Sequence, residues 1–167
     1  MIAIDRGDLP LAIYEGAKLI EVPVSPWADP IALLGALAEV ESSFGAMNVP
    51  RAEPAWLPGG KYFDMSLYKK WGSLAAMSYS SFQIMHPVAV ELGYNKDRNP
   101  LELWNDEVAI FWVCQYIKKR ILGRGASSLS DFADGFNSGT HLDKYVPTNY
   151  IEKFEKEYAR VRKRRNL

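Results

Sequence analysis

The chain has 167 residues, 48% of them hydrophobic and 24% charged, which is the composition of a globular domain and excludes a disordered, collagen-like or low-complexity protein. Its 20 Lys and Arg balance its 20 Asp and Glu, which argues against a nucleic-acid-binding protein. With one cysteine, Cys114, and two histidines, His86 and His141, it can form no internal disulfide, and we expect neither a metal nor a cofactor.

The prolines and glycines divide the first part of the chain. Residues 1–28 contain three prolines and short alternating segments, so we expect a loop-rich N-terminal segment, with room for one strand, packed on the domain. Asp29-Pro30 has the pattern of an N-cap followed by a proline, and predicts a helix over residues 31–44. Residues 45–63 hold three prolines and should form a long irregular loop.

The rest of the chain carries mainly helix signals, over residues 64–76, 87–92, 104–121, 129–136 and 151–161. The segment 104–121 is apolar nearly all round, which is typical of a central helix. We therefore predict a mostly α-helical single domain with at most a small β-hairpin. Residues 159–167 are rich in arginine and form a predicted basic tail.

One carboxylate lies on the apolar side of a predicted helix. On a helical wheel of residues 31–44, Glu41 falls about 280° from Ile31, among the leucines, whereas Glu39 faces solvent. A carboxyl group packed among leucines loses hydration, so its pKa should rise and it could keep a proton near neutral pH, as a general acid must. The alternative is that the helix frays at its last turn and Glu41 points into water.

Three short blocks of sequence add a resemblance: Glu41-Ser42-Ser43-Phe44, residues 78–85 (SYSSFQIM) and Phe136-Asn137-Ser138-Gly139. In order and spacing they resemble the three blocks of the soluble lytic transglycosylase and goose-type lysozyme superfamily, particularly its phage endolysins. The resemblance implies an α+β lysozyme-like fold with a substrate cleft, and a catalytic domain over residues 29–158. Several positions depart from the family's pattern: Ser80, Ser81, Phe82, His86 and Phe136.

The resemblance also implies site residues. Glu41 matches the family's catalytic glutamic acid. Four further positions match residues of the family's saccharide cleft or its surroundings: Gln83, Met85, Asn137 and Tyr150. Tyr79 is added as an aromatic ring that could stack on a sugar. Glu53 belongs to an Arg51-Ala52-Glu53-Pro54 element that looks like one in some phage members, so it is a candidate second carboxylate.

A member of this family would cleave the β-1,4 bond between N-acetylmuramic acid and N-acetylglucosamine in peptidoglycan glycan strands. Glu41 would protonate the leaving oxygen. In a lytic transglycosylase the same glutamate then takes the proton of the 6-hydroxyl group and gives a 1,6-anhydro product. Two alternatives stay open: an inverting lysozyme in which Glu53 or Asp64 activates water, and a non-catalytic lysozyme-like domain that binds cell wall.

The start of the chain, Met1–Pro10, lacks the apolar stretch of a secretion signal, and no apolar run is long enough to cross a bilayer. We therefore expect a monomeric phage endolysin with no signal peptide and no transmembrane segment. It would pass from the host cytoplasm to the periplasm and cell wall through a holin or on lysis, or travel with the virion. The basic tail could contact anionic envelope polymers, and nucleic acid is the weaker alternative.

Overall fold

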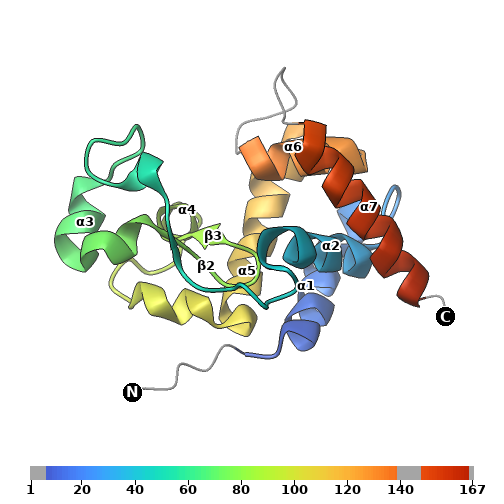
Figure 1. Ribbon diagram of the computed structural model, residues 1–167, viewed down its shortest axis with the longest axis horizontal. Helices are drawn as coiled ribbons and strands as arrows, with labels where there is room; N and C mark the ends of the chain where they lie inside the picture. Colours follow the sequence, from blue (N-terminus) through green and yellow to red (C-terminus); the bar gives the residue numbers. More distant parts are fainter. Residues whose placement is uncertain (1–6, 139–147, 166–167) are drawn as a thin grey trace.

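The computed structural model describes residues 7–138 and 148–165, which form mostly helices and one small sheet (Figure 1). The longer helices are α1 (Leu9–Val24), α2 (Pro30–Ser42), α3 (Met65–Trp71), α4 (His86–Glu91), α5 (Asp106–Tyr116), α6 (Leu129–Ser138) and α7 (Thr148–Arg165). Shorter helical segments are η1 (Pro54–Trp56), η2 (Gly72–Ala76), η3 (Pro100–Trp104), η4 (Ile117–Ile121) and η5 (Leu122–Arg124). The strands are β1 (Arg51–Ala52), β2 (Met77–Tyr79) and β3 (Ile84–Met85). The prediction of a mostly helical single domain is confirmed.

The N-terminal segment is helical, so the prediction of a loop-rich segment was wrong for residues 9–24. The side chain of Asp8 caps α1 by accepting a hydrogen bond from the backbone N–H of Leu11 (3.1 Å). Pro10 stands in the first turn, where its missing N–H costs nothing, whereas Pro23 stands inside the last turn, where it removes one helical hydrogen bond. The buried residues of α1 follow helical spacing: Leu9, Ala12, Ile13, Gly16, Ala17, Ile20 and Val24. Pro10 therefore suits the start of α1, and the helix ends one residue after Pro23.

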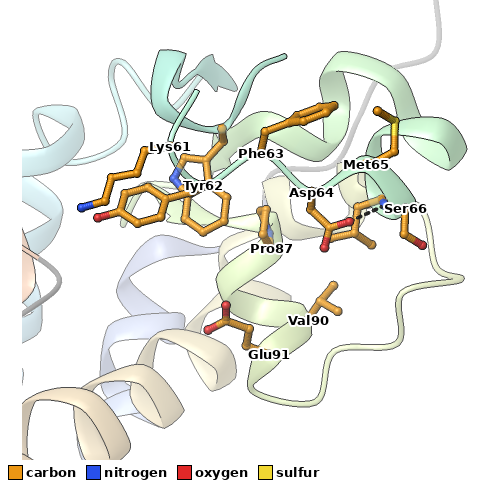
Figure 2. Close-up of a pocket in the computed structure, with 11 residues that line it drawn as sticks. Lys61, Tyr62, Phe63, Asp64, Met65, Ser66, Pro87, Val90 and Glu91 are labelled. Carbon is orange, nitrogen blue, oxygen red and sulfur yellow. Dashed lines mark hydrogen bonds between the residues drawn. The ribbon is translucent and has the colours of Figure 1, made fainter. Parts of the chain in front are cut away.

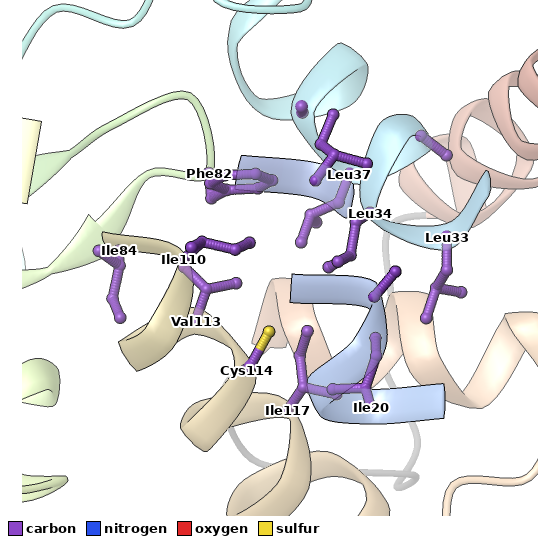
Figure 3. Packing of buried hydrophobic residues seen from close by; sticks show 14 of the residues in the cluster. Ile20, Leu33, Leu34, Leu37, Phe82, Ile84, Ile110, Val113, Cys114 and Ile117 are labelled. Atoms are coloured by element: carbon purple, nitrogen blue, oxygen red, sulfur yellow. The ribbon is translucent and has the colours of Figure 1, made fainter. Parts of the chain in front are cut away.

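Helix α2 is the most enclosed helix, because every residue from Ala32 to Ala38 is buried. It packs against α1 and α7. A β-carbon added at Gly35 would lie only 3.1 Å from a methyl carbon of Val161, so the small residue lets α7 approach closely. Figure 3 shows the leucines of α2 pointing toward residues of α1, α5 and η4, and these residues together form the largest part of the core.

The segment predicted as the central helix lies nearer the surface than α2. Phe111 of α5 is 44% exposed, so α5 buries one face and leaves the other to solvent. After Tyr116 the α-helical hydrogen bonding changes to one π-helical turn, η4. Helix α5 therefore packs against several elements through one face, whereas α2 is enclosed on all sides between Ala32 and Ala38.

The sheet has three antiparallel strands in the order β1-β2-β3. Ser78 of β2 pairs with Arg51 on one side and with Met85 on the other. The expectation of at most a β-hairpin was wrong, since β1 arises within the predicted irregular loop. Pro50 and Pro54 flank the two paired residues without occupying their positions, and so leave the ladder hydrogen bonds possible.

In space, α3, α4 and the sheet lie at one end of the molecule and α1, α2, α6 and α7 at the other, with α5 between them (Figure 1). The predicted basic tail is not a separate segment, because residues 159–165 continue α7. Within the described ranges, no helix has the length and apolar character that crossing a bilayer would require.

Candidate active site

Glu41 is held in the last turn of α2 by a structured helix end. The helix stops at Ser42, two residues before the predicted end, because Ser43 and Phe44 adopt left-handed φ angles of 52° and 54°. The backbone N–H of Phe44 donates back to the carbonyl oxygen of Ala38 (3.1 Å), which satisfies a carbonyl group of the final turn. The turn is therefore capped, and the alternative of a frayed end with a solvated Glu41 was wrong.

The carboxyl group of Glu41 is partly buried. Burial raises its pKa above the ordinary value, as predicted. The phenolic O–H of Tyr150 donates to Oε1 of Glu41 (2.5 Å) and opposes this rise, as do the positive charges of Arg51 and Lys153, while the charge of Glu53 adds to it. Burial also raises the pKa of Tyr150, as does the neighbouring carboxylate, so the tyrosine remains a hydrogen-bond donor.

Glu41 opens into a cleft of about 510 Å³. Five of the residues expected at the site line it together: Glu41, Glu53, Gln83, Met85 and Asn137. They come from α2, the β1–η1 connection, the β2–β3 turn, β3 and α6, and so from chain segments up to about 100 residues apart. The same cleft is lined by Trp56 and Tyr62, two aromatic residues near the blocks that the sequence also offers for stacking on a sugar, and by residues that nothing in the sequence indicated, including Glu91, Tyr116 and Arg120.

Two predicted residues do not line the cleft. Tyr79 has no exposed surface and donates from its hydroxyl group to the carbonyl oxygen of Leu74 (2.7 Å), so the expectation that it stacks on a sugar was wrong. Successive residues of a strand face opposite sides, and the side chain of Tyr79 points into the core. Tyr150 lies against Glu41 and contacts the acid without being part of the cleft wall.

The amide group of Gln83 is fixed in one orientation. Its Oε1 accepts a hydrogen bond from the hydroxyl group of Ser78 (2.7 Å), and its Nε2 donates to the carbonyl oxygen of Ser80 (2.9 Å). The backbone of Gln83 has a φ angle of 52°, which the tight turn between β2 and β3 requires. An amide nitrogen carries two hydrogens, so one donor is left to meet a ligand in the cleft.

The other carboxylates of the cleft are each bound to an arginine. Oε1 of Glu53 accepts from Nε of Arg51 (2.8 Å), and Oε2 of Glu91 accepts from a terminal nitrogen of Arg120 (2.9 Å). Asp64, the further candidate for a second carboxylate, lies elsewhere, because it caps α3 by accepting from the backbone N–H of Leu67 (2.9 Å). Asp64 lines an adjoining hollow and not the cleft of Glu41.

A buried group of polar residues ties the Glu41 turn to the Gln83 turn. The hydroxyl group of Ser42 donates to the carbonyl oxygen of Ser81 (2.8 Å). The backbone N–H and the hydroxyl group of Ser81 in turn donate to the two carboxylate oxygens of Asp106 (both 2.7 Å), at the start of α5. A helix N-terminus favours a carboxylate. Ser81, which departs from the family's pattern, thus links both cleft walls to α5.

No family model, no curated protein and no solved structure matches the chain. Among the residues that the structure describes, no group of three or more His, Cys, Asp or Glu could hold a metal ion. Gly139, the last residue of the third sequence block, lies outside the described residues.

Proposed function

We propose that the protein is a peptidoglycan-cleaving enzyme with a lysozyme-like fold, and that it acts as a lytic transglycosylase with Glu41 as general acid and then base. One observation carries the proposal. Three sequence blocks that are far apart in the chain supply Glu41, Gln83 and Asn137 to a single cleft, and the acid among them is partly buried. A cleft lined by an acid of raised pKa and by amide groups suits cleavage of an N-acetylated polysaccharide.

The geometry supports a distinct task for each residue. Burial raises the pKa of Glu41 and so favours its protonated form, which is the form that would donate to the glycosidic oxygen as the sugar gains oxocarbenium character. Tyr150 holds one carboxylate oxygen and so fixes the direction in which the other points. Gln83 and Asn137 carry amide groups that can donate to and accept from acetamido and hydroxyl groups.

The lytic transglycosylase mechanism is favoured over the hydrolytic one because it needs no second carboxylate. Of the described residues in the cleft, the other two carboxylates are Glu53 and Glu91, and each is bound to an arginine. An inverting lysozyme would need one of them to activate water. Glu53 is the better placed of the two for that alternative, since its charge acts on the pKa of Glu41.

The proposal extends to a phage endolysin that acts on the host cell wall. Its positive surface lies on the last turns of α7, where Arg160 is paired with Glu39 and Glu157, and Arg165 is paired with Asp29. The cations that these pairs leave exposed on the same turns are Arg162, Lys163 and Arg164. They could contact anionic polymers of the envelope, in a manner weakened by salt.

Product analysis in ¹⁸O-labelled water tests this proposal. A lytic transglycosylase should release from purified peptidoglycan a 1,6-anhydro product that carries no label and is lighter than the hydrolysis product by the mass of one water. A labelled reducing end would instead identify a hydrolase and assign a water-activating role to a second carboxylate. If no soluble product forms, the protein does not cleave the glycan strand.

A further inference from the structure

Two turns of strained backbone flank the cleft. The Glu41 turn (residues 42–45) ends α2, and the Gln83 turn (residues 80–83) joins β2 to β3. In the described part of the chain, the non-glycine residues with left-handed φ angles all belong to these two turns: Ser43, Phe44, Ser80 and Gln83. Such φ angles are unfavourable for residues with a side chain, and they persist where the surrounding structure holds them. Both turns therefore depend on contacts made by their neighbours.

The two turns touch each other directly. The hydroxyl group of Ser42 donates to the carbonyl oxygen of Ser81 (2.8 Å) and accepts from the backbone N–H of Gly45 (2.9 Å). A β-carbon added at Gly45 would lie only 3.1 Å from the hydroxyl oxygen of Ser81. Because the atoms of the two turns are already in contact, a shift of one turn displaces the other.

Asp106 fixes this contact to α5. One of its carboxylate oxygens accepts from the backbone N–H of Ser81 and the other from the hydroxyl group of Ser81 (both 2.7 Å). Hydrogen bonds to an ionised group are stronger than those between neutral groups. Asp106, Ser81 and Ser42 are each at most 2% exposed, so water does not compete for these bonds. Helix α5 in turn packs against α1, α4 and β3, which gives the carboxylate a rigid support.

Asp106 acts on the site from outside the cleft. Neither Asp106 nor Ser81 lines the cleft, whereas Glu41 and Gln83 both do. The distance between the acid on one wall and the amide group on the other depends on how the two turns are held. A displacement of about 1 Å in a reacting geometry can lower the rate by about a hundredfold. A residue that holds both turns therefore influences the reaction without touching the substrate.

We propose that Asp106 is the positioning residue of the site, which holds the Glu41 turn and the Gln83 turn in the one arrangement that serves the reaction; its role in catalysis rests on the proposed function. Without the carboxylate, both turns relax toward ordinary backbone conformations. The acid then meets more water, and the amide group of Gln83 loses its fixed place opposite the acid. The effect appears at both turns at once.

Hydrogen exchange at two backbone amides tests the inference without depending on turnover. The N–H of Gly45 is bonded to the hydroxyl oxygen of Ser42, and the N–H of Gln83 is bonded to the carbonyl oxygen of Ser80 (3.2 Å), so each reports the opening of its own turn. In Asp106→Ala both amides should exchange about ten- to a hundredfold faster, which is the effect of losing a hydrogen bond to a charged group.

The pKa of Glu41 gives a second readout. Since burial is what raises this pKa, it should fall toward its ordinary value in Asp106→Ala, as followed by carbon NMR of the labelled glutamate carboxyl groups. Asp106→Asn keeps an oxygen that accepts from the N–H of Ser81 and adds a donor for its hydroxyl oxygen. It should therefore restore both the slow exchange and the raised pKa.

Asp64→Ala is the matched control. Asp64 also stands at the start of a helix and accepts from a backbone N–H, that of Leu67 (2.9 Å), but it lies in the hollow beside α4 that Figure 2 shows. Its loss should destabilise α3 and leave the exchange at Gly45 and Gln83 and the pKa of Glu41 unchanged. If Asp106→Ala does not fold, Ser81→Ala removes one of the two bonds and should give the same pattern at smaller size.

Activity separates the inference from the proposed function. With soluble glycan strands as substrate, kcat should fall about ten- to a hundredfold in Asp106→Ala, with a smaller change in KM, and recover in Asp106→Asn. Unchanged exchange at either turn of a folded Asp106→Ala protein would overturn the inference, as would an equal rise in Asp64→Ala or an unchanged kcat. A wild-type protein that cleaves no glycan would contradict the proposed function, while exchange and titration would still show whether Asp106 holds the two turns.

Discussion

Removing the hydroxyl group of Tyr150 should raise the pKa of Glu41 further. In the folded protein, burial raises this pKa, and the hydrogen bond from Tyr150 is the largest opposing contribution. The bond, 2.5 Å long, stabilises the charged carboxylate more than the neutral acid. A hydrogen bond to a charged group contributes about 1.5–3 kcal/mol, so Tyr150→Phe should strengthen proton binding at Glu41 by a factor of about ten to a hundred.

The titration can be followed directly by carbon NMR of the labelled glutamate carboxyl groups, with the Glu41→Gln spectrum to assign the signal. In the active enzyme the alkaline limb of kcat/KM should move in the same direction, because the acid must be protonated to donate. The matched control is Tyr158→Phe, eight residues along the same helix, whose hydroxyl oxygen accepts from the backbone N–H of Asp29 (2.7 Å). A lower or unchanged pKa of Glu41 in Tyr150→Phe would refute the reasoning.

Three other changes probe the fold and the chemistry. Burial lowers the pKa of His86 to about 4 from the ordinary 6.5, so on acidification the unfolded chain binds a proton at this residue before the folded chain does. Lowering the pH from 6.5 to about 4 should therefore cost about 3 kcal/mol in the free energy of unfolding. In urea unfolding, His86→Phe should lose that much less stability over the same pH range. Ser81→Ala removes one donor from the buried carboxylate of Asp106 and should lower the free energy of unfolding by about 1–3 kcal/mol, whereas Ser130→Ala, on the exposed side of α6, should change it little. Glu53→Gln should retain turnover within a few-fold if Glu41 acts alone, and a loss of about a hundredfold or more would identify Glu53 as a general base.

The position of Glu41 could be predicted from the sequence because it depends on local rules. The Asp29-Pro30 start fixes the helical phase, and the side chain of Asp29 does cap α2, accepting from the backbone N–H of Ala32 (2.9 Å). Counting forward from there places Glu41 on the side of the leucines. The partial burial of its carboxyl group follows from that phase and from the capped end of the helix.

The predictions for the N-terminal segment and for Tyr79 were wrong because each depended on where a residue stands within its helix or strand, which residue type alone does not show. The prolines of α1 indicated a loop, but Pro10 costs nothing in the first turn and Pro23 falls only one residue before the helix ends, so the number of prolines was a misleading signal. Tyr79 was expected at the site because it belongs to the second sequence block, but a block does not show which of its residues point into the core, as Tyr79 does.

Arg120 reaches the cleft from a π-helical turn and meets Glu91 of α4, a residue 29 positions earlier in the chain. The buried group of Ser42, Ser81 and Asp106 likewise joins three elements that only the folded chain brings together.

The most direct test of the central claim compares two glutamates of one helix. Glu39 and Glu41 both lie on α2, but Glu39 is paired with Arg160 (2.9 Å) outside the cleft, and only Glu41 opens into it. The release of soluble fragments from purified peptidoglycan should persist in Glu39→Gln and vanish in Glu41→Gln, with both variants folded as judged by thermal unfolding. Undiminished release by Glu41→Gln would contradict the assignment of Glu41 as the acid.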